Sequence, residues 1–274
     1  MAKPIYTYPS DEIGSAATIT LTTGTADSNY PVTNVGTPSP AFPFLSTIPA
    51  PSSASAVDIL WDHGSAVDAK IFSLHHHNIP AGTDVRFQRN AANVWVAPSM
   101  DVAVTISTFP NTGLPDPFAV DLTAQAGYGS YRYSRLHVPS LSQLVGVGSA
   151  LIWSAKRQDL RALRFPIRPQ EQHTTRKFRT SHGVFNRYRL GVRLRQVEGV
   201  IRNTNADFST WLAWFRAARG DFGSFLYWLD LTTSIGWIAN FGEDTSDVEY
   251  SAYNVSPAHV VIEEMSSGPA LPTS

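Results

Sequence analysis

Three consecutive histidines, His75, His76 and His77, are the residues whose type and spacing first point to chemistry. His75 and His77 fall on one face of a predicted strand, and imidazole is a common ligand of transition metals. His63, just after the preceding predicted strand, would be a third ligand. No carboxylate stands at a spacing typical of a metal site, so the run is better explained as support for a strand end. The sequence therefore predicts no metal site and no cofactor.

Catalytic motifs are absent from the sequence. The stretch Gly146–Ser149 lacks the closing glycine of a nucleophile elbow, and Gly127–Gly129 lacks the rest of a dinucleotide-binding fingerprint. The chain has no cysteine, which excludes disulfides, thiolate metal sites and cysteine nucleophiles. Asp230 is a carboxylate in an apolar setting, as a raised-pKa acid would need, but it more simply ends a strand. These observations predict a protein that is not an enzyme, and a polysaccharide-degrading enzyme is kept as the third alternative.

From Tyr188 the residues alternate, which predicts one half-buried strand with an arginine row on one face. A solvated strand face, a contact with nucleic acid and a charged surface between subunits all remain possible interpretations. Beyond Arg219 the chain has no Lys or Arg, and carboxylates accumulate there, so a complementary subunit interface explains both charge runs together. The candidate interface residues are Arg187, Arg189, Arg193 and Arg195 on the basic side, and Glu243, Asp244, Asp247 and Glu249 on the acidic side.

A capped helix follows this strand. Thr204 has the side chain of an N-cap, and Gly220 can take the left-handed conformation that ends a helix, so we expect a helix over about 205–219. Its apolar stripe is Phe208, Trp211, Leu212 and Phe215. Trp214 lies off that stripe, where it would face a neighbouring molecule. The aromatic segment 222–230 is predicted to be a buried strand packed over the helix.

Composition and length indicate the fold class and the number of domains. The chain has 274 residues, of which 43% are hydrophobic and only 16% charged, and glycine and proline are plentiful. Short predicted strands at regular spacing, among them 56–61, 69–75, 84–88, 94–96 and 131–138, indicate a mainly β protein. We expect two domains, 1–150 and 151–274, with a jelly-roll β-sandwich first and a β-rich domain with one α-helix second.

The first half resembles the galactose-binding-like, or discoidin-type, jelly roll found in many phage virion proteins. Three segments carry the resemblance: the asparagine loop 30–35, the strand 57–64, and the strand 71–82 with its His-Asn-Ile-Pro-Ala-Gly end. Such jelly rolls often bind sugars through their loops, and others are purely structural. No residue here matches a sugar-binding position of the family.

The second half resembles the distal-tail and tail-tip proteins of long-tailed phages over about fifty residues. The matching positions are Gly183, Arg187 and Gly191 in a strand, Ala206, Phe208, Leu212, Phe215, Arg219 and Gly220 in a helix, and Phe222, Phe225, Tyr227 and Asp230 in a following strand. The resemblance implies a homo-oligomeric ring, a hexamer, that joins the tail tube to the tip complex. Those proteins usually carry the ring domain first, whereas here it follows the jelly roll.

Together these features predict a structural virion protein of the phage tail tip or baseplate. The expected partners are further copies of itself, the tail tube protein, and the tail-tip hub and fibre proteins. The alternative is a carbohydrate-binding adsorption protein that grips a host glycan. No apolar run approaches the roughly 20 residues that span a bilayer, and residues 1–4 lack the hydrophobic core of a secretion signal. We therefore expect no membrane span, with assembly into the virion in the host cytoplasm.

Overall fold

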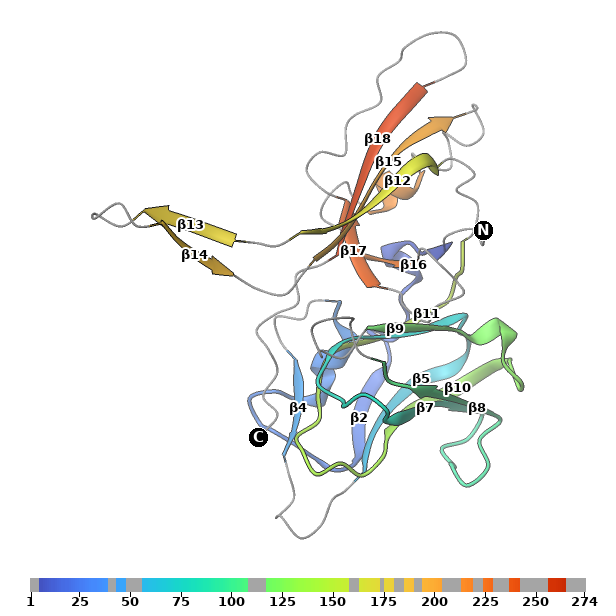
Figure 1. Ribbon diagram of the computed structural model, residues 1–274. Coiled ribbons are helices and arrows are strands. Elements are labelled where there is room, and N and C mark those ends of the chain that lie inside the picture. Colours follow the sequence, from blue (N-terminus) through green and yellow to red (C-terminus); the bar gives the residue numbers. More distant parts are fainter. Residues whose placement is uncertain are drawn as a thin grey trace. The chain divides into compact units, whose positions relative to one another are not determined.

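The computed structural model describes residues 5–38, 43–47, 56–107, 117–157, 163–172, 175–179, 185–189, 194–203, 213–218, 224–228, 237–241 and 256–264. The chain divides into two compact units. The first holds the described residues of Met1–Gln158 and Leu226–Trp237, and the second those of Asp159–Phe225 and Ile238–Pro269. Each unit is built mainly from β-strands (Figure 1).

The first unit contains two five-stranded antiparallel sheets. One sheet has the order β2 (Thr18–Thr23), β5 (Val57–Asp68), β10 (Ser130–Val138), β7 (Asp84–Asn90), β8 (Met100–Thr105). The other has the order β3 (Thr25–Ala26), β4 (Phe44–Thr47), β11 (Gly146–Trp153), β6 (Ile71–His77), β9 (Phe118–Asp121). Short 3-10 turns lie between strands at three places, η1 (Pro9–Asp11) before β2, η2 (Val32–Gly36) between β3 and β4, and η3 (Leu122–Ala124) between β9 and β10.

One hydrophobic core joins the two sheets, and both contribute to it, with Trp61 and Phe87 from one and Phe72 and Ile152 from the other. Strand alternation decides which side chains enter this core. In the second half of β10, Ser134, Leu136 and Val138 point inward and are buried, whereas Arg135 and His137 between them are partly exposed. The mainly β class and the N-terminal jelly-roll β-sandwich predicted from the sequence are confirmed.

Two of the predicted strand assignments change. Residues 94–96, predicted as a strand, form an irregular loop between β7 and β8, so that prediction is wrong. Conversely, β4 lies in the proline-rich stretch 31–51, where the sequence pattern does not predict a strand. A three-residue apolar run has no partner strand to hold it, whereas β4 pairs with β11, a hundred residues later, at Leu45 and Gly146. Partners so distant in sequence leave no local signal.

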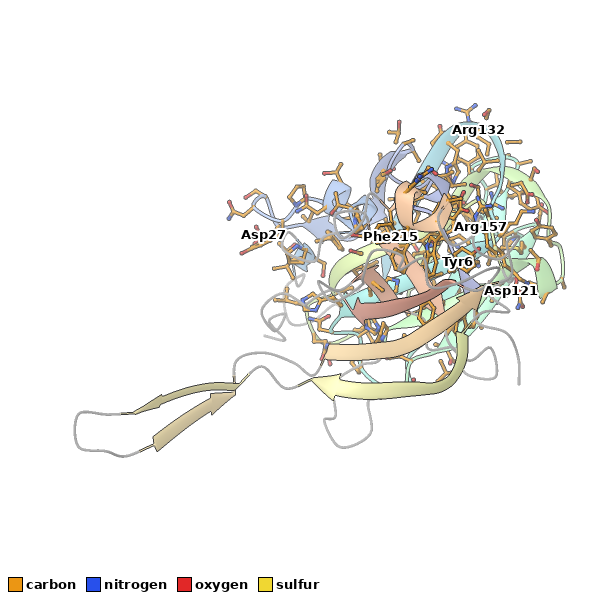
Figure 2. All side chains as sticks on the ribbon, turned by 90° about the horizontal axis from the view of Figure 1, so that it is seen from above. Tyr6, Asp27, Asp121, Arg132, Arg157 and Phe215 are labelled. Atoms are coloured by element: carbon orange, nitrogen blue, oxygen red, sulfur yellow. The ribbon has the colours of Figure 1, made fainter. Side chains whose placement is uncertain are left out.

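A short strand near the N-terminus, β1 (Ile5–Tyr6), pairs with β16 (Phe225–Trp228). The pairing continues beyond β1, because the Thr7 amide donates to the Leu226 carbonyl at 3.2 Å and the Leu226 amide to Thr7 Oγ1 at 3.0 Å. On the other side, Tyr6 and Arg157 exchange backbone hydrogen bonds of 3.1 Å, and the two lie close together (Figure 2). The beginning of the chain is therefore held between Arg157, at the end of the sandwich segment, and β16.

The second unit holds an antiparallel series of strands. In spatial order they are β12 (Leu163–Gln172), β15 (Leu194–Asn203), β18 (Ser256–Glu264) and β17 (Trp237–Phe241). A separate ribbon pairs β13 (Thr175–Arg179) with β14 (Phe185–Arg189). The predicted single arginine strand is therefore wrong: its halves belong to β14 and β15, which pair with different strands.

The predicted helix is described over residues 213–217, and its predicted start at Thr204 and end at Gly220 lie outside the described residues. Trp214 is fully buried, with its ring edge-on to Phe225 of β16 at 4.8 Å between centroids, whereas Phe215 is only half buried. The prediction that Trp214 faces a neighbouring molecule is therefore wrong. The rest of the expected stripe, Phe208, Trp211 and Leu212, lies outside the described part. No helix in the described ranges is long and apolar enough to cross a membrane.

Candidate functional site

The predicted interface residues are only partly within the described structure. Arg187 and Arg189 lie on β14, and Arg195 lies on β15. Arg193 and the four carboxylates, Glu243, Asp244, Asp247 and Glu249, lie outside the described residues. The pairing of the two charge runs across subunits therefore stays a prediction.

The histidines do not assemble into a metal site. His75 and His77 are buried on β6. His63, on β5 of the other sheet, has its Nε2 3.1 Å from Ser134 Oγ. Within the described ranges, no group of three or more histidine, aspartate or glutamate side chains could hold a metal ion.

A network of polar side chains covers the outward face of the central strand β10. The register places Arg135 directly opposite Leu60 of β5 on one side and Gln88 of β7 on the other. Arg135 donates from Nε to Gln88 Oε1 at 2.9 Å and from Nη2 to the same oxygen. Gln88 lies opposite Asp101 of β8 and hydrogen-bonds its carboxylate. One row of planar polar groups thus runs across three strands.

A second group, Asp58 and His137, extends this network toward β2. His137 Nδ1 is 2.6 Å from Asp58 Oδ1, and Arg135 Nη1 is 3.6 Å from Oδ2 of the same carboxylate. Burial alone would raise the pKa of Asp58, but the hydrogen bonds from His137 and Thr23 and the charge of Arg135 outweigh it. The pKa of Asp58 is therefore lowered, and the carboxylate is ionised at neutral pH.

Two exposed arginine–aspartate pairs border the network. Arg86 binds Asp101 with two hydrogen bonds, the one from Nε at 2.9 Å, and these hold the pKa of Asp101 below its ordinary value. Arg132 (labelled in Figure 2) binds Asp62 through Nε and Nη2 at 2.7 and 2.8 Å, which lowers the pKa of Asp62 to about 2. Such paired forks fix both side chains in one geometry.

The loop between β7 and β8 brings an indole ring over the network. The Arg135 guanidinium carbon lies 4.7 Å from the centre of the Trp95 ring. Trp95 Nε1 donates to Asn93 Oδ1 at 2.8 Å, which fixes the ring orientation. Asn90 holds both sides of the loop, because its Nδ2 donates to the Val94 carbonyl at 2.7 Å and its Oδ1 accepts from Ser99 Oγ at 2.8 Å. Trp95 is only partly exposed, whereas the exposed fraction of Val96 is 97%.

We call this set the β10 face. Its members are Trp95, Arg135, Gln88, Asp101, Arg86, Asp58 and His137. It combines one oriented aromatic ring with amide, guanidinium and carboxylate groups whose geometry is fixed by their own hydrogen bonds. Chemically it can stack an apolar ligand surface and hydrogen-bond the hydroxyls beside it. Sequence reasoning missed this face, although the lone tryptophan in an Asn-rich turn after a strand was a visible signal.

Neither a protein-family model nor a curated protein sequence matches the chain. Several solved structures are similar to about half of it. The family 32 CBM of Clostridium perfringens NanJ, solved with galactose, is 10% identical, with 52% of this chain and 98% of that chain covered at a TM-score of 0.38. The lectin domain of lectinolysin, solved with Lewis B antigen, is 10% identical over 52% and 96% of the two chains, at 0.38. A Streptococcus pneumoniae fucose-binding module is 8% identical over 52% and 98%, at 0.38.

Proposed function

We propose that the β-sandwich is a carbohydrate-binding domain and that the β10 face is its binding surface. The observation that carries the proposal is the Trp95 ring held over Arg135 at the centre of a sheet face. Sugars have one apolar face of C–H groups and a rim of hydroxyls, so an aromatic ring beside planar polar groups is chemically complementary to them.

The fixed geometry of the face also supports the proposal. Trp95 is oriented by Asn93 and Arg135, and Arg135 in turn by Gln88 and Asp58. A surface whose side chains are already immobilised loses little conformational entropy when a ligand binds, which favours binding of small, weakly interacting ligands.

The test is a screen of the full-length protein on a glycan array, followed by calorimetry with the best glycan. Trp95→Ala removes the stacking ring and is expected to weaken binding at least tenfold, because an aromatic residue at the centre of a binding surface contributes about 2 kcal/mol or more. Val96→Ala is the matched control, since Val96 is the adjacent loop residue and is almost fully exposed. Equal affinities of the wild type and Trp95→Ala would reject the β10 face as the binding surface.

The second candidate is the structural role in a phage tail tip or baseplate, as a ring joining the tail tube to the tip complex. It is supported by the sequence resemblance over residues 183–230. Electron microscopy of the purified protein tests it. Closed rings, expected to be hexameric, would support it, and a monomer at all concentrations would reject it. The two candidates are compatible, because an adsorption domain can be carried by a ring-forming protein.

A further inference from the structure

The β13–β14 ribbon concentrates positive charge on one face. Its ten residues include five cations and no carboxylate: Arg176, Lys177, Arg179, Arg187 and Arg189. The register pairs Thr175 with Arg189, Lys177 with Arg187 and Arg179 with Phe185. Because directly opposed residues share a face and alternate residues along a strand also do, one face of the ribbon carries four of the five cations. Arg176 belongs to the other face.

This arrangement is unfavourable for the ribbon alone. Like charges directly opposite each other, as at Lys177 and Arg187, destabilise a strand pair. A two-stranded ribbon is at best marginally stable in water. Within the described residues, β13 and β14 pair only with each other, so no other described strand supports them. A ligand with several negative charges would convert this repulsion into attraction.

The spacing of the cations favours a ligand with regularly repeated anions. Alternate residues of a strand are about 6.6–6.8 Å apart and paired strands about 4.8 Å apart, so the four cations form a compact, regular array. Nucleic acid offers evenly repeated phosphates, and the major groove of duplex DNA is wide enough to admit a two-stranded ribbon. The carboxylates at 243, 244, 247 and 249 are irregularly spaced and are the weaker match.

The near-neutral net charge of the whole chain, −1, does not oppose such binding. At physiological salt, charges more than about 8 Å apart are largely screened from each other when exposed. The local charge of the ribbon, and not the total charge of the protein, therefore determines its interaction with a phosphate backbone.

We infer that the β13–β14 ribbon binds the phosphate backbone of duplex nucleic acid through the face that carries Lys177, Arg179, Arg187 and Arg189. This activity is independent of sugar binding by the sandwich.

The experiment measures binding of the full-length protein to a short fluorescent DNA duplex of mixed sequence across a salt series from about 50 to 200 mM. Four phosphate contacts predict that log K falls with log salt with a slope of about −3 to −4. The double variant Lys177→Gln, Arg187→Gln is expected to reduce the magnitude of that slope by about 2 and to weaken binding at low salt at least tenfold.

Two controls separate the ribbon face from general charge. The double variant Lys70→Gln, Arg132→Gln removes the same charge from exposed positions of the sandwich and should bind DNA like the wild type. Arg176→Gln removes one cation from the opposite ribbon face and should weaken binding less than Lys177→Gln. The inference is overturned if the wild type does not bind DNA, if both double variants lose affinity equally, or if Arg176→Gln equals Lys177→Gln. It is also overturned if the ribbon variant changes only the oligomeric state, which would assign the face to a second copy of the chain.

Discussion

The two faces of strand β7 place an arginine side chain in opposite environments. Arg89 points inward and has an exposed fraction of 0%, whereas Arg86, three residues earlier, points outward and is nearly half exposed. The Arg89 guanidinium donates to Ser134 Oγ at 3.2 Å and to the carbonyls of Gly129 and Val67 at 3.1 and 2.9 Å. Arg86 binds a carboxylate instead. The inner arginine ties backbone segments together, and the outer one completes a surface network.

The electrostatic consequences differ in the same way. Burial lowers the pKa of Arg89 to about 10, and the charge of Arg89 in turn acts on His63, which is partly buried. Burial and the charge of Arg89 together lower the pKa of His63 to about 4. On the outer face each arginine is matched by an acceptor side chain, and the aspartates there have lowered pKa values. The inner cluster, Arg89 with Ser134 and His63, therefore stabilises the fold. On the outer face, the charges of the arginines and aspartates neutralise each other at the surface.

The largest expected effect distinguishes the two arginines directly. Arg89→Met leaves one hydroxyl and several buried carbonyls without their donor and should lower the free energy of unfolding by about 3–5 kcal/mol. Arg86→Met removes an exposed ion pair and should cost less than about 1 kcal/mol. Urea unfolding followed by tryptophan fluorescence measures both. Similar losses in the two variants would show that the two faces do not differ as described.

Gly127 lies very close to the loop that carries Trp95 of the β10 face. Gly127 has a φ of +75°, and a Cβ there would lie 2.0 Å from the Ser99 carbonyl oxygen, at the end of the Trp95 loop. Gly127→Ala should therefore cost roughly 2–4 kcal/mol, from backbone strain together with the displaced loop. Gly82→Ala is the control, because its φ is +80° but no atom lies within 4 Å of the added Cβ. It should cost only about 1 kcal/mol. Thermal unfolding compares them, and equal losses would argue against a close approach of Gly127 to Ser99.

The smallest expected effect is a pH dependence of the stability, caused by His63 of the inner cluster. The unfolded chain protonates His63 near its ordinary pKa of 6.5, whereas the folded protein does so only near 4. Between these values the unfolded state binds more protons, so stability falls as the pH is lowered from about 6.5 toward 4. A loss of roughly 1–2 kcal/mol between pH 7 and 4.5 is expected, because His63 is partly solvated.

Denaturant titrations of the wild type and of two variants at these two pH values measure this loss. His63→Gln should remove it. Asp58→Asn on the outer face should not, because the folded pKa of Asp58 lies below its ordinary 3.8 and its contribution is lost only under that pH. An unchanged pH dependence in His63→Gln would assign the effect to other groups.

The local pattern of the sequence was sufficient for the strands of the sandwich. The alternation around Leu136 predicted β10 to within one residue, because strand periodicity is a property of neighbouring residues. The β10 face was not predictable in this way. His137 and Asp58, which are hydrogen-bonded, are 79 residues apart, and only the register of the assembled sheet brings them together. Local spacing carries no information on such a register.

The second unit shows where helical periodicity gives the wrong face. The predicted stripe included Phe215 and excluded Trp214, but Trp214 is the buried residue. Both positions are aromatic, so hydropathy could not separate them, and the partner that decides, Phe225, lies beyond the helix. The prediction of a single arginine strand was wrong for a related reason. The alternation in the sequence continues across Gly191, although β14 belongs to a two-stranded ribbon and β15 to another sheet.

The pairing of β1 with β16 determines the order in which parts of the first unit can fold during synthesis. Residues 5–7 are made first, but their partners at 226–228 are made only after every strand of the sandwich has been synthesised. At about 5–20 residues per second, the ribosome needs roughly 4–15 s to travel from the end of β11 to the end of β16. During that interval the sandwich strands can already pair, while the first residues of the nascent chain wait for a strand that does not yet exist. The backbone groups of residues 5–7 that face β16 must then be satisfied by water or by a chaperone, which makes this segment the last part of the first unit to close.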